Sequence, residues 1–273
     1  MRQSRFNRNY ELEVNGVAVR PPMRVSFSAN KAVSGGLNKL TVQVFNLKES
    51  NRLALAKDAE DNTKNMPISF KVGYGDSLGL LFRGTVHRGI NTRKGPDIVT
   101  ELVCLDGGFD YLNSFTSKTV RGKSKAVDAV LADMPNTGKG KITKQQELIR
   151  PRVMVGASAR LLDELLDEGE TWYIDNEQLH IIKNNEVVSR FIPVVNSETG
   201  LLTTPSRENS KITFETLMNP SLKIAGLCSV ESKSAPHLDG VYKIDAIGYS
   251  GDNYGSDWTQ SVTAILAGSY SVV

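Results

Sequence analysis

The sequence predicts a mainly β (α+β) protein in which two β-rich units flank a small α/β module. Three observations lead to this prediction. Apolar and polar side chains alternate through most of residues 10–105, and the same period returns after residue 211. Helical spacing of apolar residues is concentrated between these two stretches. Glycine-containing turns separate the strand-like segments. We expect the units to span residues 1–107, 108–190 and 191–273.

The first unit opens with a predicted β-hairpin and ends in a predicted antiparallel meander over residues 66–107. Asn15-Gly16 separates two alternating segments, and this dipeptide favours a hairpin because both turn positions need positive φ. Residues 47–57 have helical spacing instead. Strands are expected at residues 10–14, 17–19, 25–27, 40–44, 68–74, 80–86 and 98–105. Short strands joined by turns predict a small barrel or a strongly bent sheet.

The middle module is predicted from two amphipathic helices. Residues 124–134 place four apolar side chains on one face and end before Pro135, which cannot continue a helix. Residues 158–168 repeat the pattern with leucines, and Gly169 fits the position just beyond a helix end. A hairpin is expected from residues 171–175 and 179–182.

The last unit returns to strand-like segments. Apolar and β-branched residues recur in short runs that are separated by Gly, Pro, Asn and Ser. Strands are expected at residues 212–217, 222–225, 227–231, 241–249 and 260–267. These five strands predict a second β-unit.

Composition excludes several classes of protein. The 273 residues carry 33 basic and 30 acidic side chains, for a net charge of +3, and the two signs are well mixed. A sequence-reading nucleic-acid binder would show a clustered basic stripe, which is missing. The basic runs at residues 2–8 and 121–125 are expected to be solvated loop charges. With no apolar run near the ~20 residues of a spanning helix, we expect a soluble protein made in a reducing cytoplasm, and no membrane contact.

The two cysteines and three histidines give no sign of a metal site. Cys104 and Cys228 both lie in apolar strand-like runs, which predicts buried free thiols rather than a disulfide. His87, His180 and His237 are far apart, and none has the helical spacing of a metal-binding pair.

Glycine-rich and acidic segments resemble known sites only superficially. Residues 73–79 do not open a helix, so a turn is favoured over a dinucleotide site. Residues 138–141 lack the surrounding pattern of a phosphate loop and are expected to be a plain loop. The acidic residues Asp163, Glu164, Asp167, Glu168 and Glu170 are expected on the solvated face of a helix.

The most site-like cluster is the glycine-rich segment GDNYGSDW at residues 251–258. Two carboxylates, Asp252 and Asp257, share it with Tyr254 and the indole of Trp258. A turn with an anchoring tryptophan is favoured over a sugar or ion site. We therefore expect no catalytic residue, no cofactor and no metal ion. Trp258 and Trp172 are both expected to be buried structural anchors.

Several stretches resemble one known family when they are taken in order. They are residues 40–47 (LTVQVFNL), 68–84, 97–107, 172–176 (WYIDN), 216–232 and 241–263. Together they are similar to the baseplate hub proteins of contractile-tailed bacteriophages, often called late control protein D, which are related to the amino-terminal part of type VI secretion VgrG. The sequence departs from the family pattern at Ile224-Ala225, where proline is common, and at Tyr249, where histidine is frequent.

The resemblance implies a structural role. It implies two similar small β-barrels flanking an α/β insertion, and a homotrimer whose barrels form a pseudo-sixfold ring. Such a ring joins the sixfold tail tube to the threefold central spike and lines the ejection channel. The implied partners are other copies of the chain, the central spike protein, tail tube proteins, baseplate wedge proteins and the tape measure protein, with transient non-specific contact with ejected DNA. The implied location is the tail baseplate of a virion assembled in the host bacterial cytoplasm.

Two further expectations follow from the resemblance. The two β-units should superpose, with residues 68–84 and 241–251 as comparable strands. The spike is expected to be a separate chain. The alternative function is a tail-associated enzyme or carbohydrate-binding module that uses Asp252, Asp257 and Trp258.

Overall fold

Strands dominate the amino-terminal part of the protein. The structure is a computed structural model and describes residues 7–61, 63–144 and 151–273. The Asn15-Gly16 hairpin and the meander are confirmed. One strand continues to Lys94, well past the end predicted at Val86, because polar residues there still pair with the next strand. The elements are β1 (Arg8–Val14), β2 (Val17–Val19), β3 (Val25–Ala32), β4 (Lys39–Phe45), α1 (Glu49–Ala54), β5 (Pro67–Tyr74), β6 (Ser77–Lys94) and β7 (Asp97–Leu105).

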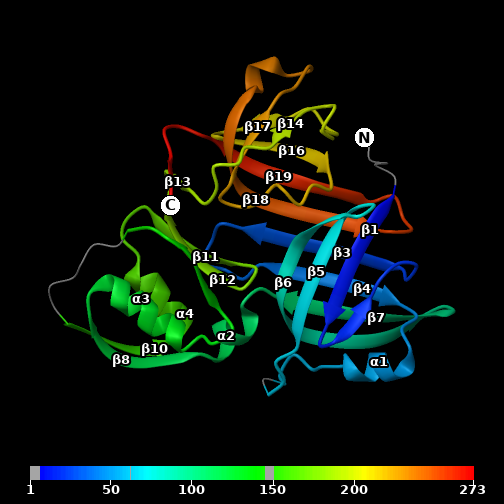
Figure 1. Cartoon of the computed structure of the whole chain (residues 1–273), viewed down its shortest axis with the longest axis horizontal. Helices are drawn as coiled ribbons and strands as arrows, with labels where there is room; N and C mark the ends of the chain where they lie inside the picture. The colour runs from blue at the N-terminus through cyan, green and yellow to red at the C-terminus, as the bar shows by residue number, and fades with distance from the viewer. Residues whose placement is uncertain (1–6, 62, 145–150) are drawn as a thin grey trace.

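The middle of the chain forms a separate block of helices and short sheets, drawn in green in Figure 1. Its elements are α2 (Gly108–Asn113), β8 (Phe115–Arg121), α3 (Lys123–Ala132), β9 (Gly138–Ile142), β10 (Pro151–Ala157), α4 (Ser158–Leu165), β11 (Glu170–Asp175) and β12 (Gln178–Lys183). The two predicted helices and the β11–β12 hairpin are confirmed, but α4 ends at Leu165, so Gly169 is not the residue just beyond its end. Helices α3 and α4 pack on the β8–β10 pair, and the block has its own buried apolar cluster.

Two predictions for this block are wrong. Residues 138–141 are not a loop but part of β9, which pairs in parallel with β12. The glycine-rich sequence has low strand propensity, so this pairing could not be predicted from it. The basic run at residues 121–125 is not wholly solvated. Lys123 is buried, and its ammonium lies 2.9 Å from the carboxylate of Glu170.

The last part of the chain returns to strands. The segment predicted as a strand at residues 222–225 is instead a buried loop. Leu222 and Ile224 are buried, but Ala225 has φ of +56°, which is incompatible with a strand. The elements are β13 (Glu186–Val187), β14 (Val194–Val195), β15 (Ser206–Glu208), β16 (Lys211–Leu217), β17 (Leu227–Val230), η1 (Pro236–Leu238), β18 (Gly240–Asp252), β19 (Trp258–Leu266) and β20 (Ser271–Val272).

Strands from both ends of the chain join in one hydrogen-bonded sheet. Among the described residues it has 13 strands, and its main path is β15-β16-β19-β18-β3-β4-β7-β6-β5-β1-β2, with β17 beside β18 and β14 beside β17. Figure 1 shows the orange β18 next to the blue β3. The mainly β class is confirmed, but the path over the described strands is open, so neither β-unit is closed as a barrel by hydrogen bonds.

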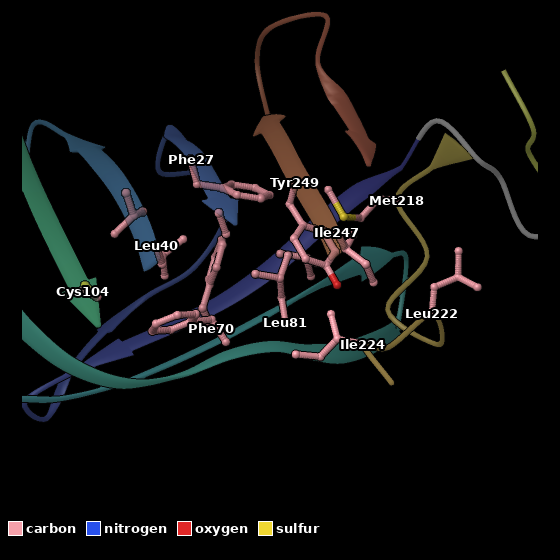
Figure 2. Packing of buried hydrophobic residues seen from close by; sticks show 14 of the residues in the cluster. Phe27, Leu40, Phe70, Leu81, Cys104, Met218, Leu222, Ile224, Ile247 and Tyr249 are labelled. Atoms are coloured by element: carbon pink, nitrogen blue, oxygen red, sulfur yellow. The ribbon is translucent and has the colours of Figure 1, made fainter. Parts of the chain in front are cut away.

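The apolar core crosses the junction between the two ends of the chain. Figure 2 shows Phe70 and Leu81 of the first part in the same cluster as Met218, Ile224 and Tyr249 of the last part. The backbone is close here as well, since a Cβ at Gly79 would lie 2.5 Å from a side-chain carbon of Pro220. Cys104 and Cys228 are buried and free, as predicted.

The strand order of the first part recurs in the last part. We call β3 to β7 repeat 1 and β15 to β19 repeat 2. Repeat 1 has the order β3-β4-β7-β6-β5, and repeat 2 has the order β15-β16-β19-β18-β17, with every neighbouring pair antiparallel in both. The corresponding strands are therefore β3 and β15, β4 and β16, β5 and β17, β6 and β18, and β7 and β19.

The hydrogen-bond register recurs too. Residues 39–45 of β4 pair with 105–99 of β7, as residues 211–217 of β16 pair with 265–259 of β19. Each long strand then has its irregularity at the same place, between Val86 and Arg88 in β6 and between Ile244 and Ala246 in β18. By this register, residues 241–251 correspond to 83–93, so the expected match to residues 68–84 is wrong. Superposition of the repeats in space stays a prediction.

Buried polar contacts hold the middle block against repeat 1. The Lys31 ammonium is 5% exposed and lies 2.6 Å from the Asp175 carboxylate. The buried Asp106 carboxylate accepts backbone hydrogen bonds from Asn176 at 2.6 Å and Glu177 at 2.7 Å. Burial is the main reason that the pKa of Asp106 is raised to about 7. These contacts fix the β11–β12 turn on the sheet, while the predicted unit boundaries stay a prediction.

Candidate functional site

The site-like residues at 252–258 form a loop between β18 and β19 that is tied to the start of the chain. The Arg8 guanidinium donates hydrogen bonds to the carbonyls of Asp252 at 2.9 Å and Ser256 at 2.6 Å. The Asn253 amide oxygen accepts from the Val25 backbone N–H at 2.7 Å. The loop is therefore a clasp between repeat 2 and the segment that leads into β3. Arg8, expected as a solvated charge, is part of it, whereas Arg2 and Arg5 lie outside the described residues.

The carboxylate of Asp252 is committed to structural contacts. It lies 2.8 Å from the Arg24 guanidinium and accepts the backbone N–H groups of Tyr254 and Gly255. Burial alone would raise the pKa of Asp252, but these hydrogen bonds and the Arg24 charge hold it below its usual range. A general acid needs the opposite shift. The Asp257 carboxylate accepts the Ser256 hydroxyl at 2.9 Å.

Both tryptophans are buried, as predicted. Trp258 is 2% exposed and meets the Phe27 ring edge to face, with the centroids 5.5 Å apart. Trp172 is 1% exposed, and its indole N–H donates to Asp163 at 2.6 Å. Asp163 accepts this bond while it stays exposed, as predicted, whereas Glu170 is buried and leaves the solvated acidic face predicted for it. A buried indole is not available to stack on a sugar.

The other candidate positions are dispersed. His180 stacks on Tyr173, and burial lowers its pKa, so the imidazole is neutral near neutral pH. Gly75 and Asp76 form the turn predicted within residues 73–79. Across residues 7–61, 63–144 and 151–273, no three His, Cys, Asp or Glu side chains are grouped closely enough to hold a metal ion. No helix in the same part of the chain is long and apolar enough to cross a membrane.

A polar face that crosses both repeats is the larger functional candidate. Alternate residues of eight neighbouring strands point to the same side of the sheet, as the cross-strand pairing shows. These strands are, in sheet order, β15, β16, β19, β18, β3, β4, β7 and β6. The side chains on this side are uncharged polar, charged and apolar, and almost all are fully or partly exposed. The uncharged polar side chains are the largest of these groups. They include Ser26, Ser28, Asn30, Thr41, Gln43, Thr92, Ser206, Thr213, Ser250, Thr259, Ser261 and Thr263.

Charges on this face are mixed and partly paired. Glu101 lies 2.8 Å from the Gln43 amide and 3.7 Å from the Arg88 guanidinium. Lys211 lies 2.7 Å from Asp245. The face therefore carries no basic stripe. The sequence analysis did not predict this face. The similar segments KLTVQ at 39–43 and KITFE at 211–215 could have indicated a repeated strand with one polar side.

Comparison with known proteins gives a family match and several similar folds. The model of a family described as baseplate hub gp41 matches residues 7–264. No curated protein sequence matches the chain. A 43 kDa tail protein of prophage MuSo2 from Shewanella oneidensis is similar at a TM-score of 0.66 and 10% identity, over 96% of this chain and 97% of that one.

Two further structures have similar folds. A tail protein from Neisseria meningitidis has a TM-score of 0.62 at 9% identity, over 97% of this chain and 99% of that one. An E. coli component of the type VI secretion system, described as structurally similar to the T4 bacteriophage tail proteins gp27 and gp5, has a TM-score of 0.68 at 10% identity, over 95% of this chain and 78% of that one. At such identities the structures show the fold alone.

Proposed function

Because the chain belongs to the baseplate hub gp41 family of phage tail structural proteins, we propose that three copies of it form a ring at the centre of a tail baseplate. In this ring the six repeats face the sixfold tail tube, and the three chains face the threefold central spike. A closed ring needs each repeat to present the same contacts at every step. The ring would be a symmetry adaptor with no catalytic role.

The observation that carries this proposal is the recurrence of register in two repeats that are already joined side by side. Repeat 1 and repeat 2 share strand order and the position of the irregularity in the long strand. Strand β18 of repeat 2 pairs with β3 of repeat 1 over residues 246–252. One chain therefore supplies two similar neighbouring units, and three chains supply six.

The copy number in assembled particles tests the ring. Cryo-microscopy of purified tails should locate three copies of this chain in one ring, with repeats 1 and 2 alternating around it. Six copies in a ring, or repeats that do not superpose, would contradict the proposal. Mass spectrometry of the same particles, calibrated against a tube protein of known copy number, gives an independent count.

The polar face is proposed to line the ejection channel. Uncharged hydroxyl and amide side chains contact a passing duplex weakly, whereas many Lys and Arg contacts to phosphates would hold it. We expect ejected DNA to make only transient, non-specific contact. In a binding titration with a short duplex, the assembled ring should show weak binding that decreases further as salt is added. Tight binding at physiological salt would contradict this assignment.

The proposed partners follow from the place of the ring. They are the central spike on the threefold side, tail tube proteins on the sixfold side, and the baseplate wedge and tape measure proteins around and within it. We propose that the hub assembles in the host bacterial cytoplasm before it enters the virion. Co-expression of the chain with spike and tube proteins of the same particle should give a complex that contains all three.

An enzymatic or sugar-binding role for residues 252–258 is the alternative, and it has less support. The Asp252 carboxylate forms a salt bridge with Arg24, and the Trp258 ring is buried. A peptidoglycan-release assay decides between them. We expect the same background release from the parent, Asp252→Asn and Asp257→Asn proteins. Hydrolysis by the parent that either substitution abolishes would overturn the purely structural role.

A further inference from the structure

The chain contains one junction between its two repeats. The strands that correspond to those of this junction have open edges, where a second junction could form. In the existing junction, β3 of repeat 1 pairs with β18 of repeat 2, with Ser28 opposite Ser250 and Ala29 opposite Tyr249. The counterpart of β3 is β15, and the counterpart of residues 246–252 in β18 is residues 88–94 in β6. A ring of alternating repeats needs a contact between these counterparts in neighbouring copies.

Both counterparts have an unpaired edge in the part of the chain that the structure describes. Strand β15 ends the sheet order and pairs with β16 alone. Strand β6 pairs with β5 over residues 77–85. Past that point, backbone hydrogen bonds are formed on this edge by Val86, whose N–H donates to Met66, and by Gly89, which bonds Lys57 through both backbone groups. Residues 90–94 of β6 are partly or fully exposed, as is all of β15. Unpaired edges of this kind are templates for another strand.

We propose, resting on the ring described above, that β15 of one copy adds to the open edge of β6 in the next copy. The register follows from the existing junction. Ser206 would lie opposite Thr92, as Ser28 lies opposite Ser250, and Arg207 would lie opposite Asn91, as Ala29 lies opposite Tyr249. The occupant of each edge is thus a second copy of this chain.

The backbone directions agree with this register. Gly89 directs its N–H and C=O toward the open edge of β6, so alternation directs those of Asn91 and Arg93 the same way. In the β15–β16 hairpin, Glu208 and Lys211 flank a two-residue turn and form its closing hydrogen-bonded pair, so Arg207 directs its backbone groups outward. Asn91 and Arg207 can therefore bond each other.

The side chains agree as well. Thr92 and Ser206 would form a hydroxyl pair on the polar face, like the existing Ser28 and Ser250 pair, and Thr–Ser pairs across strands are stabilising. Exposed apolar side chains occur at both edges, since Ile90 is 38% exposed on β6 and Leu202, which bonds β16 through its backbone just before β15, is 49% exposed. Pro205 would face Arg93 and ends the pairing, because proline has no N–H.

A disulfide trap tests the register in assembled particles. Thr92 and Ser206 would be a pair without mutual backbone hydrogen bonds, with Cα atoms about 4.5 Å apart, within the range a disulfide spans. The Thr92→Cys, Ser206→Cys double variant should give covalent dimers and trimers of this chain after mild oxidation. Cys104 and Cys228 do not interfere, because both are fully buried.

Matched controls separate register from mere proximity. Each single variant should give no ladder. The Thr92→Cys, Arg207→Cys variant moves one thiol to the opposite face of β15 and should cross-link at least about tenfold less. An equal yield from this control, or a cross-link to a different protein, would overturn the proposed pairing.

A second variant and the copy number complete the test. Arg207→Pro removes only an outward N–H of an edge strand, so the isolated chain should melt like the parent while particle yield falls. Unchanged particle yield would count against the pairing. Three copies per ring with no cross-link in the Thr92→Cys, Ser206→Cys variant would leave the hub function standing and reject this edge contact, whereas six copies would reject the trimeric ring itself.

Discussion

The two repeats share one register but differ in the connection between their last two strands. In repeat 1, β6 and β7 are joined by the tight turn at Gly95-Pro96, where Gly95 has φ of +63°. In repeat 2, β18 and β19 are joined by the longer loop that Arg8 and Arg24 hold against the segment before β3. The same strands therefore support a clasped junction inside the chain and an unclasped edge on β6. This difference is consistent with a permanent β3–β18 contact inside the chain and a β15–β6 contact that forms only when copies assemble.

The largest expected effect comes from a core position at which the repeats carry different side chains. Trp258 begins β19, and its counterpart at the start of β7 is Ile98. Replacing the buried Trp258 with alanine should cost about 3–5 kcal/mol of the free energy of unfolding, as other large aromatic truncations do. Ile98 is only partly buried, so Ile98→Ala should cost less than about 2 kcal/mol.

Chemical denaturation of the two variants measures this difference. A Trp258→Ala protein that unfolds at the same denaturant concentration as the parent would refute the anchoring role. Equal losses for the two variants would mean that the repeats do not differ here.

A smaller effect is expected from the clasp itself. Arg8→Ala removes hydrogen bonds from a charged donor to several loop carbonyls, which should cost about 1–2 kcal/mol. Lys94 is the counterpart of Asp252 and lies on the unclasped edge, so Lys94→Ala should change stability by less than about 0.5 kcal/mol. Thermal melts of both variants compare the edges directly. A larger loss from Lys94→Ala than from Arg8→Ala would reverse the assignment of clasped and unclasped edges.

The smallest expected effect is the pH dependence of the clasp. The pKa of Asp252 is lower in the folded protein than its usual value of 3.8. The folded state thus favours the ionised form, and this contribution is present above pH 3.8 and is lost as the pH falls through the folded pKa. Between about pH 5 and about pH 3, the parent should lose more stability than Asp252→Asn. Parallel losses in denaturant titrations at the two pH values would contradict this.

The sequence determined most local structure, because local structure depends on nearby side chains. Asn15-Gly16 specified a hairpin, leucine spacing specified α4, and alternation specified the buried and exposed sides of β4 and β16. It also predicted that Trp172 and Trp258 are buried. Each of these features follows from the period of apolar residues or from the φ that a turn requires.

Only the tertiary structure decided which strands meet and what the loop residues contact. Leu222, Ile224 and Ala225 are buried in a turn rather than a strand, because the backbone reverses where it packs beside Leu81. The carboxylate of Asp252 became part of a clasp through Arg8 and Arg24, which are more than two hundred residues earlier in the chain. Periodicity tells which side of a strand is buried, but the partner at an open edge depends on backbone groups and register that distant segments bring together.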